Sequence, residues 1–150
     1  MKVITHQGDV DAPCDRAFAY VADYRTVPRW FFAVRRFDPL SEQTEGVGAT
    51  FAAEMTIGPK TMKSTVQITE WVENERIRLE SIDGMVTDST WSFRDNGHGG
   101  TVLDVRFGYA LPGGLAGRAL AAIVEPVVGQ AVRHTESTLR EQVLASRSLG

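Results

Sequence analysis

Residues 115–146 read LAGRALAAIVEPVVGQAVRHTESTLREQVLAS, and this stretch decides which fold the sequence predicts. A mostly apolar set of residues recurs at steps of three and four positions, which places it on one side of a helix. The set is Leu120, Val124, Val127, Val128, Ala131, Thr135, Leu139 and Val143. The charged residues on the opposite side are Arg118, Glu125, Arg133, Glu136, Arg140 and Arg147. The pattern predicts one long amphipathic helix that packs on an apolar surface.

Pro126 and Gly129 interrupt this helical pattern. Proline donates no hydrogen bond to the preceding turn and its ring crowds that turn's carbonyl, so we expect a kink or a short break. The part after Pro126 spans about 30 Å at roughly 1.5 Å per residue, the length of a strand of about nine or ten residues. This part can therefore line a sheet from end to end, while residues 115–125 cover one rim and can move as a lid.

The composition limits the classes of protein that fit. A chain of 150 residues with a net charge of -3 is long enough for one domain, residues 1–150, with its own core. Nucleic acid and anionic membranes both favour clustered Lys and Arg, and no such run occurs, so we expect neither nucleic acid nor stable membrane insertion. The first residues do not form a signal peptide, and no stretch is apolar enough to span a bilayer. The single cysteine, Cys14, excludes an internal disulfide and favours the cytoplasm.

The first 32 residues predict a strand followed by two short helices. Residues 2–10 have the pattern of a strand, and Asp11-Ala12-Pro13 begins a helix because proline suits the first helical position. Asp23 is the expected N-cap of a second short helix over residues 24–30. Three aromatic residues follow one another in Trp30-Phe31-Phe32, and they cannot all point inward. We therefore interpret them as the mouth of a pocket.

From residue 33 onward the pattern changes from the period of a helix to the period of two that strands have. Six further strands are predicted, over residues 33–40, 51–57, 62–69, 76–80, 88–93 and 103–109. Turn signals lie at Gly58-Pro59, Asp83-Gly84 and Asn96-Gly97. The fold class is therefore α+β, with a curved antiparallel sheet of seven strands wrapped around the long C-terminal helix and two short helices after the first strand.

Several phrases, in this order along the chain, resemble those of a known superfamily. They are Val10-Asp11-Ala12-Pro13, Pro28-Arg29-Trp30, Gly46-Val47-Gly48, Val66-Gln67-Ile68-Thr69-Glu70-Trp71 and Leu111-Pro112-Gly113-Gly114. With the order of elements, they are similar to the START-like (SRPBCC) superfamily and its polyketide cyclase/dehydrase and lipid-transport branch. The resemblance covers essentially the whole chain and implies the helix-grip (Bet v 1-like) fold. It leaves function open, because the superfamily includes lipid carriers, hormone receptors, aromatase/cyclases and co-chaperone modules.

The resemblance also implies a pocket between the concave sheet and the C-terminal helix. The inward-facing residues mix large groups with small or hydroxylated ones, which fits either a filled core or a cavity with a few orienting hydroxyls. The resemblance favours a cavity, on the order of 300–1,000 Å³. The candidate ligand-binding residues are Trp30, Phe32, Phe51, Ala53, Met55, Met62, Ser64, Val66, Leu79, Ser89, Trp91, Leu103, Val105, Phe107, Val124, Val128, Ala131 and Thr135.

The sequence offers few catalytic candidates. His98 lies in a glycine-rich turn and His134 on a helix flank, so we expect the first to be solvated and the second partly exposed. His6 is the candidate for an acid or base in the pocket, provided that the side of its strand shared with Ile4 and Val10 faces inward. No spacing of His, Cys and carboxylates indicates a metal site, and no glycine-rich loop from a strand to a helix indicates a phosphate site. We expect no metal and no cofactor.

Three functions remain for the structure to distinguish. The first is the binding or carriage of a hydrophobic small molecule, such as a lipid, polyketide or other ring-containing metabolite. The second is a polyketide aromatase/cyclase or dehydratase, in which positioning alone supplies much of the rate. The third is a protein-interaction module, which needs an exposed apolar patch beside a filled interior. The sequence leaves a homodimer open.

Overall fold

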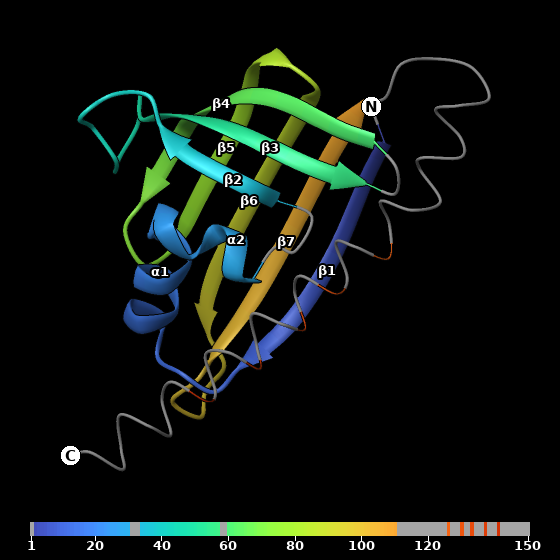
Figure 1. Ribbon diagram of the computed structural model, residues 1–150. Helices are drawn as coiled ribbons and strands as arrows, with labels where there is room; N and C mark the ends of the chain where they lie inside the picture. Colours follow the sequence, from blue (N-terminus) through green and yellow to red (C-terminus); the bar gives the residue numbers. More distant parts are fainter. Residues whose placement is uncertain are drawn as a thin grey trace.

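The computed structural model describes residues 2–30, 34–57 and 60–110 and the single positions 126, 130, 133, 137 and 141. Its centre is one strongly curved antiparallel sheet of seven strands in the order β1-β7-β6-β5-β4-β3-β2 (Figure 1). The strands are β1 (Lys2–Val10), β2 (Val34–Pro39), β3 (Thr50–Ile57), β4 (Lys60–Val72), β5 (Arg76–Gly84), β6 (Val86–Asp95) and β7 (Thr101–Ala110). The predicted seven-stranded sheet is confirmed.

The N-terminal strand β1 pairs with β7, the last strand of the meander that runs from β2 to β7, so β1 and β2 form the two edges of the described sheet. Ile4, His6 and Gly8 lie opposite Phe107, Val105 and Leu103. Residues paired in this way point to the same side of a sheet. Because Phe107, Val105 and Leu103 are buried, the side of β1 that carries His6 faces inward.

Three short helical elements follow β1 and lie on the concave side of the sheet: α1 (Cys14–Ala22), the 3-10 helix η1 (Tyr24–Thr26) and α2 (Val27–Trp30). Pro13 takes the N-cap position, one residue before the expected place, and Cys14 begins the first turn. The Phe18 ring packs edge-on against the rings of Trp71 and Phe93, with ring centres 5.1 Å and 5.5 Å apart respectively. These contacts attach α1 to the sheet.

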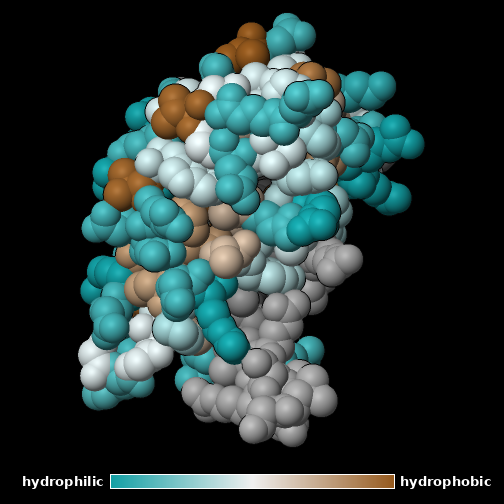
Figure 2. All heavy atoms as spheres, turned by 90° about the vertical axis from the view of Figure 1, so that its left-hand side faces the viewer, coloured by the Kyte–Doolittle hydropathy of each residue, from teal (hydrophilic) through white to brown (hydrophobic). Residues whose placement is uncertain are grey.

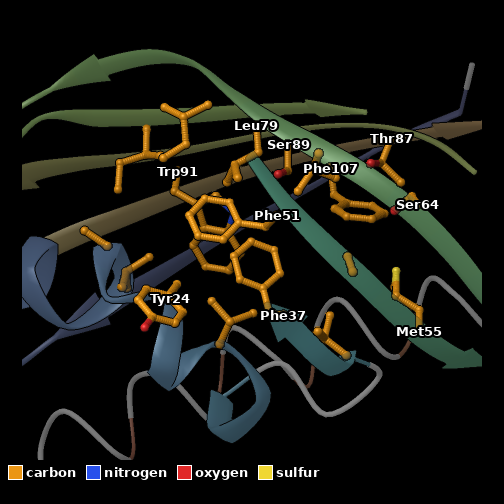
Figure 3. A pocket seen from close by; sticks show the side chains of 18 of the residues that line it. Tyr24, Phe37, Phe51, Met55, Ser64, Leu79, Thr87, Ser89, Trp91 and Phe107 are labelled. Carbon is orange, nitrogen blue, oxygen red and sulfur yellow. The ribbon is translucent and has the colours of Figure 1, made fainter. Parts of the chain in front are cut away.

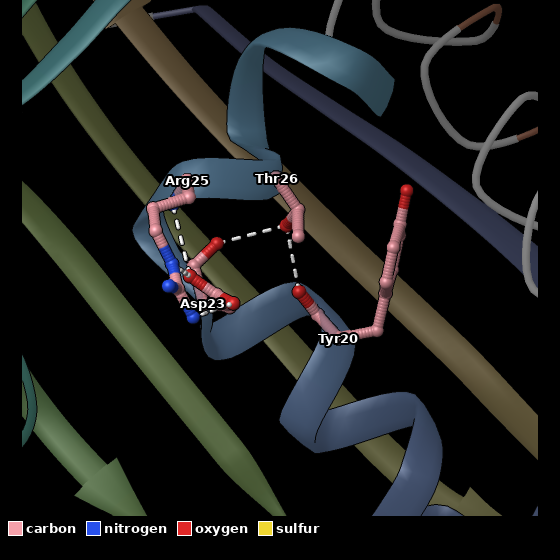
Figure 4. A network of polar contacts seen from close by, with 4 residues as sticks. All are labelled: Tyr20, Asp23, Arg25 and Thr26. Atoms are coloured by element: carbon pink, nitrogen blue, oxygen red, sulfur yellow. Dashed lines mark hydrogen bonds and ion pairs between the residues drawn. The ribbon is translucent and has the colours of Figure 1, made fainter.

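The second predicted helix is present as two elements, η1 and α2. Asp23 is its N-cap, as predicted, because its carboxylate accepts a hydrogen bond from the Arg25 backbone N–H at 3.0 Å (Figure 4). The buried Thr26 hydroxyl donates to the carbonyls of Tyr20 at 2.7 Å and Asp23 at 2.8 Å. These bonds satisfy carbonyls at the end of α1 and hold η1 against it.

The curvature of the sheet has a local cause in β4. This strand is 13 residues long, and its pairing with β5 shifts between Thr65 and Val66 and again between Ile68 and Glu70. Such bulges bend a strand and increase its twist. The result is a concave face that can enclose space.

The described part of the stretch quoted at the start consists of five positions: Pro126, Gln130, Arg133, Ser137 and Glu141. All five are helical and exposed. Steps of three and four residues place them on one face of a helix, and Arg133 belongs to the predicted polar side. The apolar side of that helix, its kink and the proposed lid lie outside the described residues. No described helix has the length and apolarity that a membrane span requires.

A conformational constraint in the sheet gives a first prediction. Gly84 has φ +77°, and a Cβ there would collide with the Lys63 carbonyl oxygen and lie 2.9 Å from the Ser64 Cα. Gly97 has φ +84°, but a Cβ there would meet no described atom within 4 Å. Gly97→Ala should therefore cost only the backbone strain, about 1–2 kcal/mol. Gly84→Ala should cost clearly more, measured by urea unfolding. Equal losses of unfolding free energy in the two variants would show that β4 and β5 rearrange to accommodate the added methyl group at no cost.

The convex face of the sheet carries ion pairs between neighbouring strands. Arg78 donates two hydrogen bonds to Asp88, at 3.0 and 2.8 Å, and Arg94 donates one to Asp104 at 3.2 Å. The pKa of the Asp88 carboxyl lies below its ordinary value of 3.8 because Arg78 donates hydrogen bonds to it. Partial burial opposes that shift, and the charges of Arg78 and Arg106 support it.

This pKa shift predicts how stability depends on pH. A carboxyl whose pKa is lower in the folded chain stabilises the fold above its unfolded value and loses that contribution as pH falls through its folded value. Asp88→Asn should therefore lower the melting temperature at neutral pH. The difference from wild type should shrink below about pH 4 and vanish at lower pH. Asp38→Asn, at an exposed position of β2, is the control. A difference that persists in acid would contradict the assignment.

Candidate ligand-binding site

A cavity of about 90 Å³ lies between the concave face of the sheet and the segment from α1 to β2 (Figure 3). It is lined by Val21, Ala22, Tyr24, Val27, Val34, Phe37, Phe51, Ala53, Met55, Ser64, Val66, Ile68, Trp71, Ile77, Leu79, Thr87, Ser89, Trp91 and Phe107. Strand alternation explains most of this set, because every second residue of β3, β5 and β6 points to the same face. The wall opposite the sheet comes from the short helical elements and β2.

The structure brings together many of the predicted site residues. Those that line the cavity are Phe51, Ala53, Met55, Ser64, Val66, Leu79, Ser89, Trp91 and Phe107. Leu103 and Val105 do not line it, because both are packed in the buried core, and Met62 lies two residues nearer the β3–β4 turn than Ser64. The Trp30 side chain, Phe32, Val124, Val128, Ala131 and Thr135 lie outside the described residues. A role in ligand binding stays a prediction for every member of the set.

Sequence reasoning missed several lining residues, some of which strand alternation could have identified. Thr87 lies on the same side of β6 as Ser89 and Trp91, so alternation could have found it. Phe37 lies between Arg36 and Asp38 in a predicted strand and has the same signal. Trp71 could not be found this way. The bulge between Ile68 and Glu70 changes which face β4 presents, so Ile68 and Trp71 both point inward.

Aromatic rings occupy much of the space on the described side of this cavity. The predicted cavity of 300–1,000 Å³ was bounded by the helix of residues 124–143, whose inward side lies outside the described residues, so its volume stays a prediction. Phe37 and Phe51 stack with ring centres 4.6 Å apart and planes 16° from parallel. The Tyr24 ring lies 5.9 Å from Phe51. The prediction rested on small residues such as Ala53 and Ser89 and did not include Tyr24 or Phe37. An apolar cavity of about 150 Å³ binds benzene, so a ring ligand here requires a wall residue to move.

The polar groups of the cavity are few. The lining residues that the structure describes include no Asp, Glu, His, Lys, Arg or Cys, and their hydroxyl groups belong to Tyr24, Ser64, Thr87 and Ser89. His6 faces the concave side but is not one of these lining residues. His98 is exposed in its turn, where its backbone N–H donates to Asn96 Oδ1 at 2.8 Å. His134 lies outside the described residues.

An outer groove lies on the other side of Ala22, Tyr24 and Trp71, which line both the groove and the cavity. Its charged residues are Asp15, Asp23, Arg25, Glu45 and Glu73. Since Arg25 is paired with Asp23 at 2.9 Å, the groove is acidic. An acidic groove disfavours the approach of anions.

The exposed surface bears on the third predicted function, because an interaction module needs a contiguous apolar patch. On the face shown in Figure 2, the most hydrophobic side chains are separated from one another by hydrophilic ones, and a continuous area of moderately hydrophobic side chains lies near the centre. Exposed large hydrophobic residues among those described include Leu40, Val47 and Ile82. Apolar residues scattered singly are normal on soluble proteins and do not indicate an interface.

Comparisons with known proteins agree with this geometry. A family model described as polyketide cyclase / dehydrase and lipid transport matches residues 1–143. The Zhui aromatase/cyclase of Streptomyces sp. R1128 has a TM-score of 0.80 at 15% identity, over 95% of each chain. The protein TTHA0849 of Thermus thermophilus has a TM-score of 0.77 at 21% identity, over 97% of this chain and 99% of the other.

A START superfamily protein of Mycobacterium smegmatis has a TM-score of 0.70 at 17% identity, over 95% of this chain and 97% of the other. At such identities, the likeness to all three structures shows the fold alone. A comparison with curated proteins finds no match.

Proposed function

This chain belongs to the polyketide cyclase/dehydrase and lipid transport family, and we propose that it binds or carries a hydrophobic small molecule in the cavity between its concave sheet and its helices. The observation that carries the proposal is the character of the cavity wall, which is aromatic and aliphatic, with hydroxyls as its polar groups and no charged side chain among the described lining residues. Ligand pockets of this kind bury apolar surface and use few polar groups for orientation.

The absence of ionisable groups from the described lining, Tyr24 apart, favours binding over catalysis. A general acid or base must lie within hydrogen-bonding distance of the proton that it transfers. Tyr24 is the one lining residue of the described set that could do so, and it lies at the aromatic end of the cavity. Cytoplasmic location and action as a carrier belong to this proposal.

Native mass spectrometry after mild extraction from cells tests the proposal. We expect a fraction of the protein to retain a small molecule that extraction with organic solvent removes. The uncharged dye N-phenyl-1-naphthylamine should bind the emptied protein with a dissociation constant of about micromolar. A protein that carries no ligand and binds no such dye would contradict the proposal.

A polyketide cyclase is the second candidate. It is favoured by the fold shared with an aromatase/cyclase over 95% of each chain and by the aromatic walls, which could hold a chain in a ring-forming shape. Positioning of reacting groups can supply about 7–11 kcal/mol of a barrier. Incubation with a reactive poly-β-keto thioester distinguishes the candidates, because an enzyme would change the ratio of cyclised products and a carrier would only protect the chain.

A further inference from the structure

The hydroxyl groups of Ser64, Thr87 and Ser89 gather at one end of the cavity. In Figure 3 their side chains lie around Phe107, away from Tyr24 and Phe37. Thr87 and Ser89 are successive inward positions of β6, and Ser89 pairs with Phe107 of β7. Ser64 comes from β4, on the other side of β5. Two strands, β4 and β6, therefore build one polar end opposite the aromatic end.

Among the described residues, these hydroxyls have no protein partner. No hydrogen bond within that part of the chain joins the side-chain oxygen of Ser64, Thr87 or Ser89 to another residue, although Ser81 Oγ nearby accepts one from the Thr87 backbone N–H at 2.9 Å. Thr87 is only 8% exposed. Ser64 and Ser89 are half-buried, and all three side chains line the cavity. A hydroxyl that lines a cavity can bind water there, and a polar group of a ligand can replace that water. A group that enters the cavity can supply the missing partner.

The charge around the cavity selects the kind of group. A carboxylate at the polar end would be buried with no cation among the described lining residues, and burial of an unpaired charge is strongly unfavourable. The groove beyond Tyr24 is acidic and also disfavours anions. A hydroxyl or carbonyl oxygen carries no such cost and can accept a hydrogen bond from each of several hydroxyls.

We propose, on the basis of the function proposed above, that the ligand is an uncharged ring-containing molecule whose hydroxyl or carbonyl oxygen is bound by Ser64, Thr87 and Ser89. The rings lie against Phe51 and Trp91, and the oxygen determines the direction in which the molecule enters. Fatty acids and other anionic amphiphiles are rejected.

Displacement of N-phenyl-1-naphthylamine by three matched compounds tests this inference. 2-Naphthol and 2-methylnaphthalene have nearly the same shape and differ in one hydroxyl, and 2-naphthoate adds a negative charge. The ratio of the dissociation constants of 2-methylnaphthalene and 2-naphthol isolates the contribution of the hydroxyl. We expect Thr87→Val and Ser89→Ala each to lower this ratio about two- to tenfold, the range for a net hydrogen bond. 2-Naphthoate should bind at least tenfold more weakly than 2-naphthol.

The control is Thr90→Val, which makes the same change on the same strand but on the convex face. It should leave all three affinities unchanged. Ser64→Ala, on a different strand, gives a second measurement if Thr87→Val does not fold. If the dye and both neutral compounds bind but no variant changes the ratio, the inference is overturned and the proposed function stands. If 2-naphthoate binds as tightly as 2-naphthol, selection by charge is overturned. If neither the dye nor a neutral compound binds, both proposals are overturned.

Discussion

Ala53→Leu should abolish binding of N-phenyl-1-naphthylamine, with at least a tenfold loss of affinity. Ala53 is 9% exposed, lies between Phe37 of β2 and Ser64 of β4, and lines the cavity. The three added carbon atoms of leucine enter a space of about 90 Å³. Overpacking of a well-packed site typically costs about 1–3 kcal/mol, so the variant should fold with a reduced melting temperature. Dye titration and thermal unfolding measure the two effects.

Ala52→Leu is the matched control, since it makes the same change one residue away on β3. Ala52 pairs with Asp38 and Thr65 and lies on the opposite face of the sheet. Its leucine should leave dye affinity within about twofold of wild type. Equal affinities in wild type and Ala53→Leu would mean that the dye binds elsewhere and would leave the cavity without a demonstrated ligand.

The pattern of the sequence was sufficient to predict the sheet. Strands of period two, separated by turn signals such as Asn96-Gly97, gave seven strands in the observed positions, most of them to within a few residues. Gly97 has the positive φ that such a turn requires. The alternation of apolar and polar residues also identified most of the inward-facing residues, because every second residue of a strand points to the buried side of an antiparallel sheet. Local sequence patterns were therefore enough to predict the strands and most of the inward-facing residues.

Features that depend on long-range geometry were not predictable. The inward position of Trp71 depends on a bulge between Ile68 and Glu70, and no residue in that run signals it. The orientation of His6 depends on the pairing of β1 with β7, about 100 residues later in the chain. The size of the cavity depends on whether the rings of Tyr24 and Phe37 fold over Phe51, and periodicity does not encode volume.

The aromatic pair in the cavity leads to the second large prediction. Phe51 is 1% exposed on β3, whereas Phe37 is half-buried on the edge strand β2. Phe51→Ala should lower the free energy of unfolding by about 3–5 kcal/mol, the usual cost of removing a fully buried ring. Phe37→Ala should cost roughly half as much, because part of its ring is already in contact with water. Urea unfolding of both variants checks this order.

Phe37→Ala should also enlarge the cavity and improve its access. A ring ligand in the wild type must displace a wall residue, and Phe37 is the candidate. Among the described strands, its strand β2 pairs with β3 alone and has a register shift between Val34 and Arg36. We therefore expect Phe37→Ala to bind N-phenyl-1-naphthylamine at least as tightly as wild type and faster in stopped-flow mixing, because displacement of the ring no longer opposes entry. Weaker and slower binding would show that Phe37 is part of the surface that holds the ligand. The variant that combines Phe37→Ala and Phe51→Ala then tests whether the two rings stabilise the fold through their stacking. If they do, the two losses of unfolding free energy should differ from additivity by about 0.5–1.5 kcal/mol, whereas two independent wall residues should give additive losses.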